Sequence, residues 1–500
     1  MPKVARTKRS KVSIYLEEFP NETFRSDGQV LYCQSCDKSV SIDQRGQVIQ
    51  HINTSKHRGN KDRKLIFQQN FISTSSASTN SKSVFNDDLC RALIRSDIPL
   101  FKLKNVAFKN FMEKYTGHKI PDESTLRKNY VGGVYEETIS KIQNIIGDGP
   151  IWVGVDETTD ADGRYIANVI VGKLSTEPSK PFLLCCEELD KCNHKTVCQL
   201  FNNAMGVLWP NGIKHNNVLL LLTDAAPYMC KAGKVLDTFY PRIIHLTCLV
   251  HGFHRIAETI RFQFSEVDSL ISNVKKIFLK APSRIQTFKD MYPDLTLPPE
   301  PIITRWGTWL SAVLYYSNNF EKIRNVVLNL DPEAAIAIKK TVELIDSKNL
   351  QNNLAFISTN FGFLVDTISK LETSKMPLTE SLEIVDNAIK QLERVPGEIG
   401  VLTNSKLKNV LEKNTGFNTV MSIRDILLNK TPNNNNSEIE YTPKEIMCMK
   451  YAPVTSVDVE RSFSRYKAML RPNRRHFTFE NFKLYVVSNC FPHEDYDESE

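Results

Sequence analysis

The stretch Asn216–Thr259, NNVLLLLTDAAPYMCKAGKVLDTFYPRIIHLTCLVHGFHRIAET, decides the fold expected for the middle of the chain. Val218 to Leu222 form an unbroken aliphatic run, typical of a strand buried on both faces, which ends at Thr223-Asp224. After a helical pattern, a second apolar run leads into Cys248-Leu249-Val250-His251. Strand, helix and strand make a βαβ unit, whose ligands gather beyond the carboxyl ends of the strands. We therefore expect Asp224 to lie near Cys248 and His251.

The same pattern occurs earlier in the chain. The apolar run Ile151 to Val155 leads directly into Asp156, and a further apolar strand pattern follows from Tyr165 to Gly172. A single aspartate after a strand is more often a helix cap or turn residue than a ligand. Two buried strands that each end at an aspartate, however, predict two carboxylates at one site. Close carboxylates repel each other, and a divalent cation such as Mg²⁺ relieves that repulsion.

Length and composition set limits on the rest of the chain. At 500 residues it is long enough for roughly three domains, and its 41% apolar and 24% charged residues are ordinary for a water-soluble protein. We find no apolar run near the roughly 18 residues that a membrane span needs, and no signal peptide. The eleven irregularly spaced cysteines indicate a reducing, intracellular environment rather than a disulfide framework.

Positive charge is concentrated at the N-terminus. Residues 1–83 contain 14 Lys and Arg and seven Asp and Glu, a net charge of +7, which equals the formal charge of the whole chain. Such a basic segment on a neutral body predicts an arm that binds a polyanion such as DNA. Taken alone, its first basic cluster is more typical of a solvated tail, with a nuclear import signal as a further alternative: Lys3, Arg6, Lys8, Arg9 and Lys11.

Four potential zinc ligands follow this basic tail. Cys33, Cys36, His51 and His57 have the spacing C-x2-C-x14-H-x5-H, which can complete a tetrahedral Zn²⁺ shell. Zinc binding would supply folding free energy on the order of 10 kcal/mol to so small a segment. Basic residues around the second histidine predict a DNA-contacting surface: Lys56, Arg58, Lys61, Arg63 and Lys64. Residues 33–57 resemble a BED-type zinc finger, and residues 8–64 resemble the CGG triplet repeat-binding protein family.

The remaining segments alternate between linkers and helical patterns. Residues 1–70 are expected to form the basic tail and finger, 71–84 a linker, and 85–149 a helical dimerisation or platform region. Helical periodicity from Val326 to Asn429 predicts an all-helical insertion, with boundaries near residues 261 and 441. Arg305-Trp306, placed in a polar loop before a helix, could bind a phosphate and stack on a base.

The last candidate acid lies near the C-terminus. In Ser456-Val457-Asp458-Val459-Glu460-Arg461-Ser462-Phe463-Ser464, Ser456 is a potential helix cap, and Val459, Phe463 and Tyr466 form an expected buried stripe. Glu460 lies next to that stripe. An isolated acid in the first turns of a helix is usually a surface charge, but the two upstream aspartates make Glu460 a candidate for the same site. Residues 491–500 form an acidic tail.

Taken in order, these motifs resemble the hAT family of DNA transposases over most of the chain. The resemblance implies an α/β fold with a ribonuclease-H-like core, built from residues 150–260 and 442–490 and interrupted by the helical insertion. It implies that Asp156, Asp224 and Glu460 are a catalytic triad that holds Mg²⁺ or Mn²⁺, with Asp160 a possible substitute for Asp156. The matching supporting residues are Cys248, His251, Arg305 and Trp306, and residues 442–490 match a dimerisation region.

The resemblance predicts a nuclear protein that binds double-stranded DNA, associates with itself, and cuts and joins DNA by two-metal phosphoryl transfer. A second hypothesis is a captured host protein that binds DNA through the finger and regulates transcription without cutting. A third, an RNA-directed nuclease, would keep the core but has no support from the other segments. Membrane association is not expected.

Overall fold

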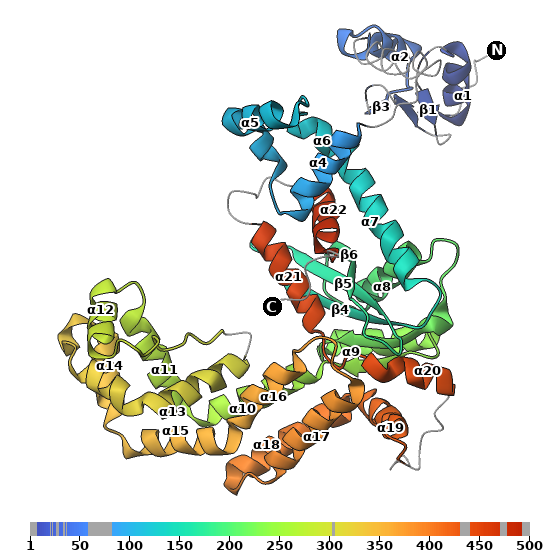
Figure 1. Ribbon diagram of the computed structural model, residues 1–500. Helices are drawn as coiled ribbons and strands as arrows, with labels where there is room; N and C mark the ends of the chain where they lie inside the picture. Colours follow the sequence, from blue (N-terminus) through green and yellow to red (C-terminus); the bar gives the residue numbers. More distant parts are fainter. Residues whose placement is uncertain are drawn as a thin grey trace. The chain divides into compact units, whose positions relative to one another are not determined.

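The computed structural model describes residues 8–20, 22, 24–26, 30–33, 36, 38–58, 83–302, 306–430, 441–470 and 478–492 (Figure 1). The chain divides into two compact units, Met1–Val84 and Phe85–Glu500, which we call the N-terminal unit and the larger unit. Each is considered by itself. Among the described helices, none combines the length and the apolar character that crossing a membrane requires.

The N-terminal unit packs two helices against a small antiparallel sheet. The strands are β1 (Phe24–Ser26), β2 (Leu31–Cys33) and β3 (Lys38–Val40), and the helices are α1 (Lys8–Glu18) and α2 (Arg45–Ile52). Its core contains a handful of buried apolar side chains, among them Val12, Leu31 and Val48. A core of this size gives little hydrophobic stabilisation, so a unit this small is expected to need a metal ion or a similar cross-link.

A five-stranded mixed sheet forms the centre of the larger unit. Its strands are β4 (Ile151–Thr159), β5 (Tyr165–Lys173), β6 (Phe182–Leu189), β7 (Val218–Thr223) and β8 (Ile244–Thr247), in the order β6-β5-β4-β7-β8. The pairs β6-β5 and β5-β4 are antiparallel, whereas β4-β7 and β7-β8 are parallel. Every residue of β7 is buried, which confirms the strand predicted from its aliphatic run. The fold class is therefore the expected α/β.

Helices surround this sheet. Between β6 and β7 lies α8 (His194–Leu208), and between β7 and β8 lies α9 (Pro227–Phe239). The C-terminal helices return to the sheet, where α21 (Val457–Met469) packs on β4 and β5, and α22 (Phe479–Cys490) packs on β6. At Gly154 of β4 a β-carbon would lie 2.9 Å from Cγ2 of Val459, so glycine permits the close approach of α21.

Helices alone occupy the described part of the chain between β8 and α21. In order they are α10 (Leu249–Gln263), α11 (Ser265–Phe278), α12 (Pro282–Met291), α13 (Trp306–Leu328), α14 (Ile336–Ile345), α15 (Lys348–Phe361), α16 (Phe363–Leu371), α17 (Leu378–Glu393), α18 (Gly397–Lys413), α19 (Phe417–Leu427) and α20 (Pro443–Cys448). This agrees with the helical periodicity of the sequence. The helix predicted to follow the Arg305-Trp306 loop already begins at Trp306, so Trp306 is its first residue rather than part of a loop.

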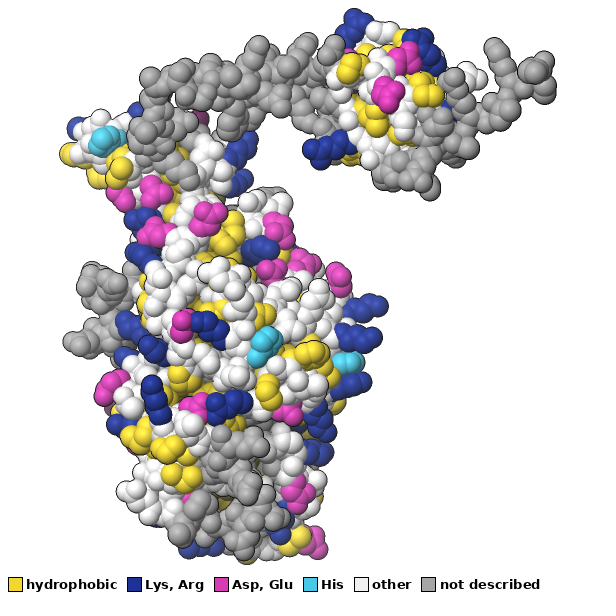
Figure 2. Space-filling view, turned by 90° about the vertical axis from the view of Figure 1, so that its right-hand side faces the viewer, with side chains coloured by type: hydrophobic (Ala, Val, Ile, Leu, Met, Phe, Trp, Pro, Cys, Tyr) yellow, Lys and Arg dark blue, Asp and Glu magenta, His cyan; other side chains and the backbone are white. Residues whose placement is uncertain are grey.

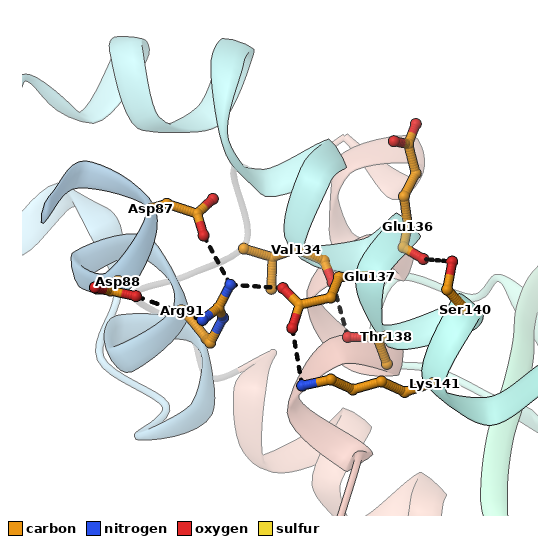
Figure 3. A network of polar contacts seen from close by, with 9 residues as sticks. All are labelled: Asp87, Asp88, Arg91, Val134, Glu136, Glu137, Thr138, Ser140 and Lys141. Atoms are coloured by element: carbon orange, nitrogen blue, oxygen red, sulfur yellow. Dashed lines mark hydrogen bonds and ion pairs between the residues drawn. The ribbon is translucent and has the colours of Figure 1, made fainter. Parts of the chain in front are cut away.

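The segment before β4 is helical, as predicted. It contains α4 (Val84–Arg95), α5 (Val106–Thr116), α6 (Glu123–Asn129) and α7 (Val131–Ile146), and Tyr485 of α22 packs into their shared core. Arg91 joins α4 to α7, because its Nη2 lies 2.7 Å from Asp87 and 2.5 Å from Glu137 (Figure 3). Lys141 contacts Glu137 at 2.8 Å from the other side.

Residues far along the chain cover the outer edge of β8. Asn414 imitates a neighbouring strand, since its side chain accepts a hydrogen bond from Thr247 N (3.0 Å) and donates one to Thr247 O (2.8 Å). Gly416 lies so close that a β-carbon would be 2.5 Å from the carbonyl oxygen of His245. The edge is therefore closed by α18 and α19 rather than left open for another strand.

Replacing Asn414 with alanine would leave the N–H and C=O of Thr247 buried without partners. We expect the Asn414→Ala variant to lose about 1–3 kcal/mol of unfolding free energy, measured by chemical denaturation of the full chain. Asn409→Ala, which removes an exposed side chain from α18, is the matched control and should change stability by less than about 0.5 kcal/mol. Equal losses in both variants would contradict this role for Asn414.

Candidate functional site

The four predicted zinc ligands converge in the N-terminal unit. The ligand atoms of Cys33, Cys36, His51 and His57 all lie within 4.8 Å of one another. Nδ1 of His57 is 3.4 Å from Sγ of Cys33 and 3.4 Å from Sγ of Cys36. Zn–S and Zn–N bonds of about 2.3 and 2.0 Å in a tetrahedron give ligand separations of roughly this size. The residues therefore fit a structural Zn²⁺ ion.

A carboxylate that sequence reasoning missed orients this cluster. Oε2 of Glu22 lies 2.8 Å from Nε2 of His57, which leaves Nδ1 of that ring facing the two sulfurs. Such a carboxylate behind a histidine ligand fixes the ring and raises its basicity as a ligand. Burial, and then the charge of His57, lowers the pKa of His51 and favours the neutral imidazole that metal binding requires. The only sequence signal for Glu22 was the position of an acid just before β1.

The predicted DNA-contacting residues are only partly within the described residues. Lys56 and Arg58 are both exposed, and Arg58 donates a hydrogen bond to Asn53 Oδ1 (2.6 Å). Lys61, Arg63 and Lys64 lie outside the described residues. Contact of this basic group with DNA stays a prediction.

In the larger unit, the parallel pairing of β4 and β7 brings two predicted acids to one edge of the sheet. Gly154 is paired with Leu222, so Asp156 and Asp224 each lie two residues beyond this pair, Asp156 within β4 and Asp224 directly after β7. Asp156 is buried and accepts a hydrogen bond from the main chain of Glu157 (2.9 Å). Burial raises the pKa of Asp156 well above its ordinary value, Asp224 adds repulsion, and His251 opposes both.

The Cys-x2-His motif lies beside these acids and contacts the third. Nε2 of His251 is 3.3 Å from Oε1 of Glu460 in the first turn of α21. Burial would lower the pKa of His251, but Cys248, Asp156 and Glu460 together raise it to about 10. Cys248 is the residue before α10 and accepts a hydrogen bond from Ser456 N (3.3 Å), just before α21. A positively charged His251 thus stands between Asp156 and Glu460.

Ser456 is found at the predicted cap position of α21, yet its hydroxyl serves a different purpose. It makes no cap hydrogen bond and instead lies 3.5 Å from Nδ1 of His251. Burial raises the pKa of the Cys248 thiol, but the nearby His251 charge and hydrogen bonds from His251 and Ser456 lower it overall. Cys248, His251 and Ser456 therefore form one hydrogen-bonded group that fixes Glu460.

Asp160, the possible substitute for Asp156, is fully engaged elsewhere. Its Oδ1 accepts hydrogen bonds from the main chain of Asp162 and of Arg164, both at 2.9 Å. Its Oδ2 contacts the Arg164 side chain at 2.8 Å and the hydroxyl of Tyr466 at 3.0 Å. Burial raises the pKa of Asp160, but these hydrogen bonds lower it overall. Asp160 fastens the β4–β5 turn to α21.

Glu157 is a further acid at this edge that the sequence analysis did not select. Its Oε2 is buried and has no hydrogen-bond partner among the described residues. Burial, together with the charge of Asp224, raises the pKa of Glu157 to about 7. Its position directly after Asp156 was the only sequence signal.

The predicted Arg-Trp pair lies largely outside the described residues. Arg305 lies outside the described residues, as does the side chain of Trp306. The neighbouring Gly307 lies against α10, since a β-carbon there would be 3.5 Å from Nε2 of His254. The start of α13 therefore lies one turn of α10 away from His251.

Asp156, Asp224 and Glu460 offer the carboxylate oxygens that hard divalent cations prefer. Their arrangement is more open than the zinc cluster. Among the described residues, the four N-terminal ligands are the single His, Cys, Asp and Glu group whose atoms all converge within 4.8 Å. The three acids are suitable ligands for a divalent cation, and a cation would relieve the repulsion between them. Among the protein's own groups, His251 supplies the positive charge that opposes this repulsion.

Two protein families match parts of this chain. Residues 8–63 match the CGGBP1 N-terminal domain, and this range contains all four zinc-site residues. Residues 121–277 match a domain of unknown function, DUF659, and contain Asp156, Asp224, Cys248 and His251. No curated protein matches the chain. Segments similar to the CGGBP1 N-terminal domain and to DUF659 thus follow one another along the chain.

The zinc site leads to a first prediction. We expect the wild-type chain to bind about one Zn²⁺ ion, and Cys33→Ser and His57→Ala to abolish binding, because a tetrahedral site loses one of four ligands. The N-terminal unit should then become sensitive to proteolysis, while the larger unit keeps its unfolding transition. Metal analysis and limited proteolysis measure this. Cys192→Ser is the control, and zinc retained in both ligand variants would contradict the assignment.

The buried acid leads to a second prediction. Because folding raises the pKa of Asp156, its ionised form destabilises the fold at any pH above its ordinary value near 3.8. Asp156→Asn should therefore raise the Tm in EDTA at pH 7 by roughly 2–4 °C for each kcal/mol relieved. The gain should shrink as the pH falls toward 4. Asp237→Asn, an exposed acid on α9, should show no such gain, and a Tm decrease in Asp156→Asn would refute the prediction.

Proposed function

We propose that this chain is a transposase-derived DNA-binding protein, whose larger unit contains a hAT-type, ribonuclease-H-like core with Asp156, Asp224 and Glu460 as its catalytic acids. One observation carries the proposal. Glu460 contacts His251 directly, and Asp156, which precedes Glu460 by more than 300 residues, interacts electrostatically with both His251 and Asp224. A structural surface charge at Glu460 would not need a dedicated, half-buried histidine partner.

The strand arrangement supports the proposed core. Three antiparallel strands followed by two parallel ones, with the first strand in the centre, is the arrangement expected for a ribonuclease-H-like sheet. The helices from α11 to α19 lie between β8 and α21, as an insertion spanning about residues 261–441 would. The DUF659 match spans the whole sheet. In this proposal residues 442–490 complete the core and contribute to self-association.

The N-terminal unit supports DNA binding. It matches the CGGBP1 N-terminal domain, can hold a structural zinc ion and has a net positive sequence. We infer that it contacts double-stranded DNA through the basic residues that follow α2, since phosphate contacts supply most non-specific affinity. A DNA-binding function also places the protein in the nucleus.

Each residue of the acidic site has a role in the proposed chemistry. Asp156, Asp224 and Glu460 would hold Mg²⁺ or Mn²⁺, which activate the attacking oxygen and stabilise the leaving oxygen in phosphoryl transfer. Asp156 suits this better than Asp160, because every oxygen of Asp160 already accepts hydrogen bonds. His251 positions Glu460 by direct contact, and Cys248 and Ser456 position His251.

A DNA-binding regulator without nuclease activity is the second candidate. The open arrangement of the acidic site favours this function. Among the described residues, the side chains that converge as metal ligands are those of the N-terminal unit, not the three acids. In this function the zinc-stabilised unit would bind DNA and the larger unit would serve self-association.

Cleavage of a labelled DNA that carries candidate element ends separates the two functions. We expect nicking that depends on Mg²⁺ or Mn²⁺ and falls at least roughly 100-fold in Glu460→Gln and in Asp224→Asn, because each removes a carboxylate that would hold the metal ions that stabilise the transition state. Asp237→Asn should cut like the wild type. Zinc-dependent binding of the same DNA without cutting by the wild-type chain would reject the transposase and support the regulator.

A further inference from the structure

Positive side chains are unevenly distributed over the larger unit. One edge of the view in Figure 2 carries a column of Lys and Arg side chains with a histidine among them. A group of five such residues lies at the start of α8 and on α9, and we call it the α8–α9 patch: Lys191, His194, Lys195, Lys231 and Lys234.

The start of α8 is held firmly by local hydrogen bonds. Asn193 caps the helix by accepting hydrogen bonds from the main-chain N–H groups of Lys195 (2.9 Å) and Thr196 (3.3 Å). The Thr196 hydroxyl in turn donates to the carbonyl of Lys191 (2.6 Å). The backbone at Lys191 and Lys195 is thus fixed, although both side chains extend into solvent.

Packing of α9 against α8 places the other two lysines. Met229 and Ala232 of α9 are buried, and the Cys198 thiol of α8 donates to the carbonyl of Ala232 (3.7 Å). Lys231 and Lys234, three residues apart on the same face, remain exposed. The pKa of His194 lies below its ordinary value because of desolvation and of the charges of Lys231 and Lys195. The two helices therefore bring their cations together.

The lysines of the patch form no ion pairs among the residues that the structure describes, since none joins Lys191, Lys195, Lys231 or Lys234 to a carboxylate there. Elsewhere on the same unit, Lys214 is paired with Asp148, and Lys483 with Glu187. Gathering like charges without counterions destabilises a fold, so such a cluster indicates an anionic ligand.

The patch adjoins the acidic site. Asp224 accepts a hydrogen bond from Ala226 N (3.1 Å), and α9, which carries Lys231 and Lys234, begins at the next residue, Pro227. The cations of the patch therefore begin beside the acid at the end of β7 and continue along α9 and the start of α8.

We propose that the α8–α9 patch is a second surface for double-stranded DNA, separate from the N-terminal unit, which binds the phosphate backbone next to Asp224. The inference rests on the proposed DNA-binding function and extends it to a particular surface. The five residues offer cations and no aromatic face, so they suit phosphates of a duplex better than unstacked bases. Contacts of this kind position DNA without reading its sequence.

The test is the salt dependence of duplex binding by the full chain. The triple variant Lys195→Gln, Lys231→Gln, Lys234→Gln is compared with the wild type and with Lys276→Gln, Lys340→Gln, Lys390→Gln, which removes three exposed lysines from α11, α14 and α17. Fluorescence anisotropy of a labelled duplex of about 30 base pairs is recorded from about 50 to about 200 mM salt. The unfolding midpoints of both triple variants serve as a check on folding.

We expect the patch variant to lower the slope of log affinity against log salt by roughly one for each lysine, and the control variant to leave the slope unchanged. The same difference should persist in a Cys33→Ser background, where the N-terminal unit lacks its zinc site. Equal slopes for patch and control variants would overturn the inference and leave the DNA-binding function standing. A wild-type chain that binds no duplex would overturn that function itself, and a preference for RNA of the same length would also reject this proposal.

Discussion

The parallel pairing of β4 with β7 is the constraint on which the larger unit depends. Both strands are apolar and buried up to an acid, so their pairing buries a continuous apolar surface and brings two carboxylates, of which Asp156 is itself buried, to the same edge. The antiparallel strands β5 and β6 extend the sheet on one side of this pair, and β8 extends it on the other. The chemistry at the edge is therefore a consequence of where the apolar runs stop.

Bringing like charges together at this edge needs a compensating charge, and the chain supplies it from two distant segments. His251 follows β8, whereas Glu460 lies more than 200 residues later in α21. Main-chain contacts join these segments directly, because Leu249 N donates to Val454 O (3.1 Å) and Ser456 N to the Cys248 thiol (3.3 Å). The site is complete only when α21, which follows the helices α10 to α20, packs against the sheet. Formation of the site is therefore coupled to folding of the larger unit.

Local patterns were sufficient to predict the parts of this protein that depend on local sequence. The apolar strands leading to Asp156 and Asp224 were predicted because buried aliphatic runs have few alternatives, although β4 continues past Asp156 to Thr159 instead of ending there. The zinc ligands were predicted because their spacing is specific. Groups defined by distant partners were not found. Asn414 at the edge of β8 and Glu22 behind His57 look like ordinary polar residues until the fold brings their partners to them. The different roles of Asp160 and Asp156 became clear only from the fold, which brings the Tyr466 hydroxyl to Asp160.

The acidic site and the α8–α9 patch have opposite charges, and their proximity has a physical consequence for bound DNA. Phosphates are attracted to Lys195, Lys231 and Lys234, yet phosphates that approach Asp224 would be repelled by the acids there. Without a divalent cation, the patch would hold a duplex at the border of the site but not inside it. Binding of a cation by the acids would reverse that repulsion locally, because the ion's charge exceeds that of any single side chain. Duplex affinity and divalent-cation affinity should therefore be coupled, each strengthening the other through the same edge of the sheet.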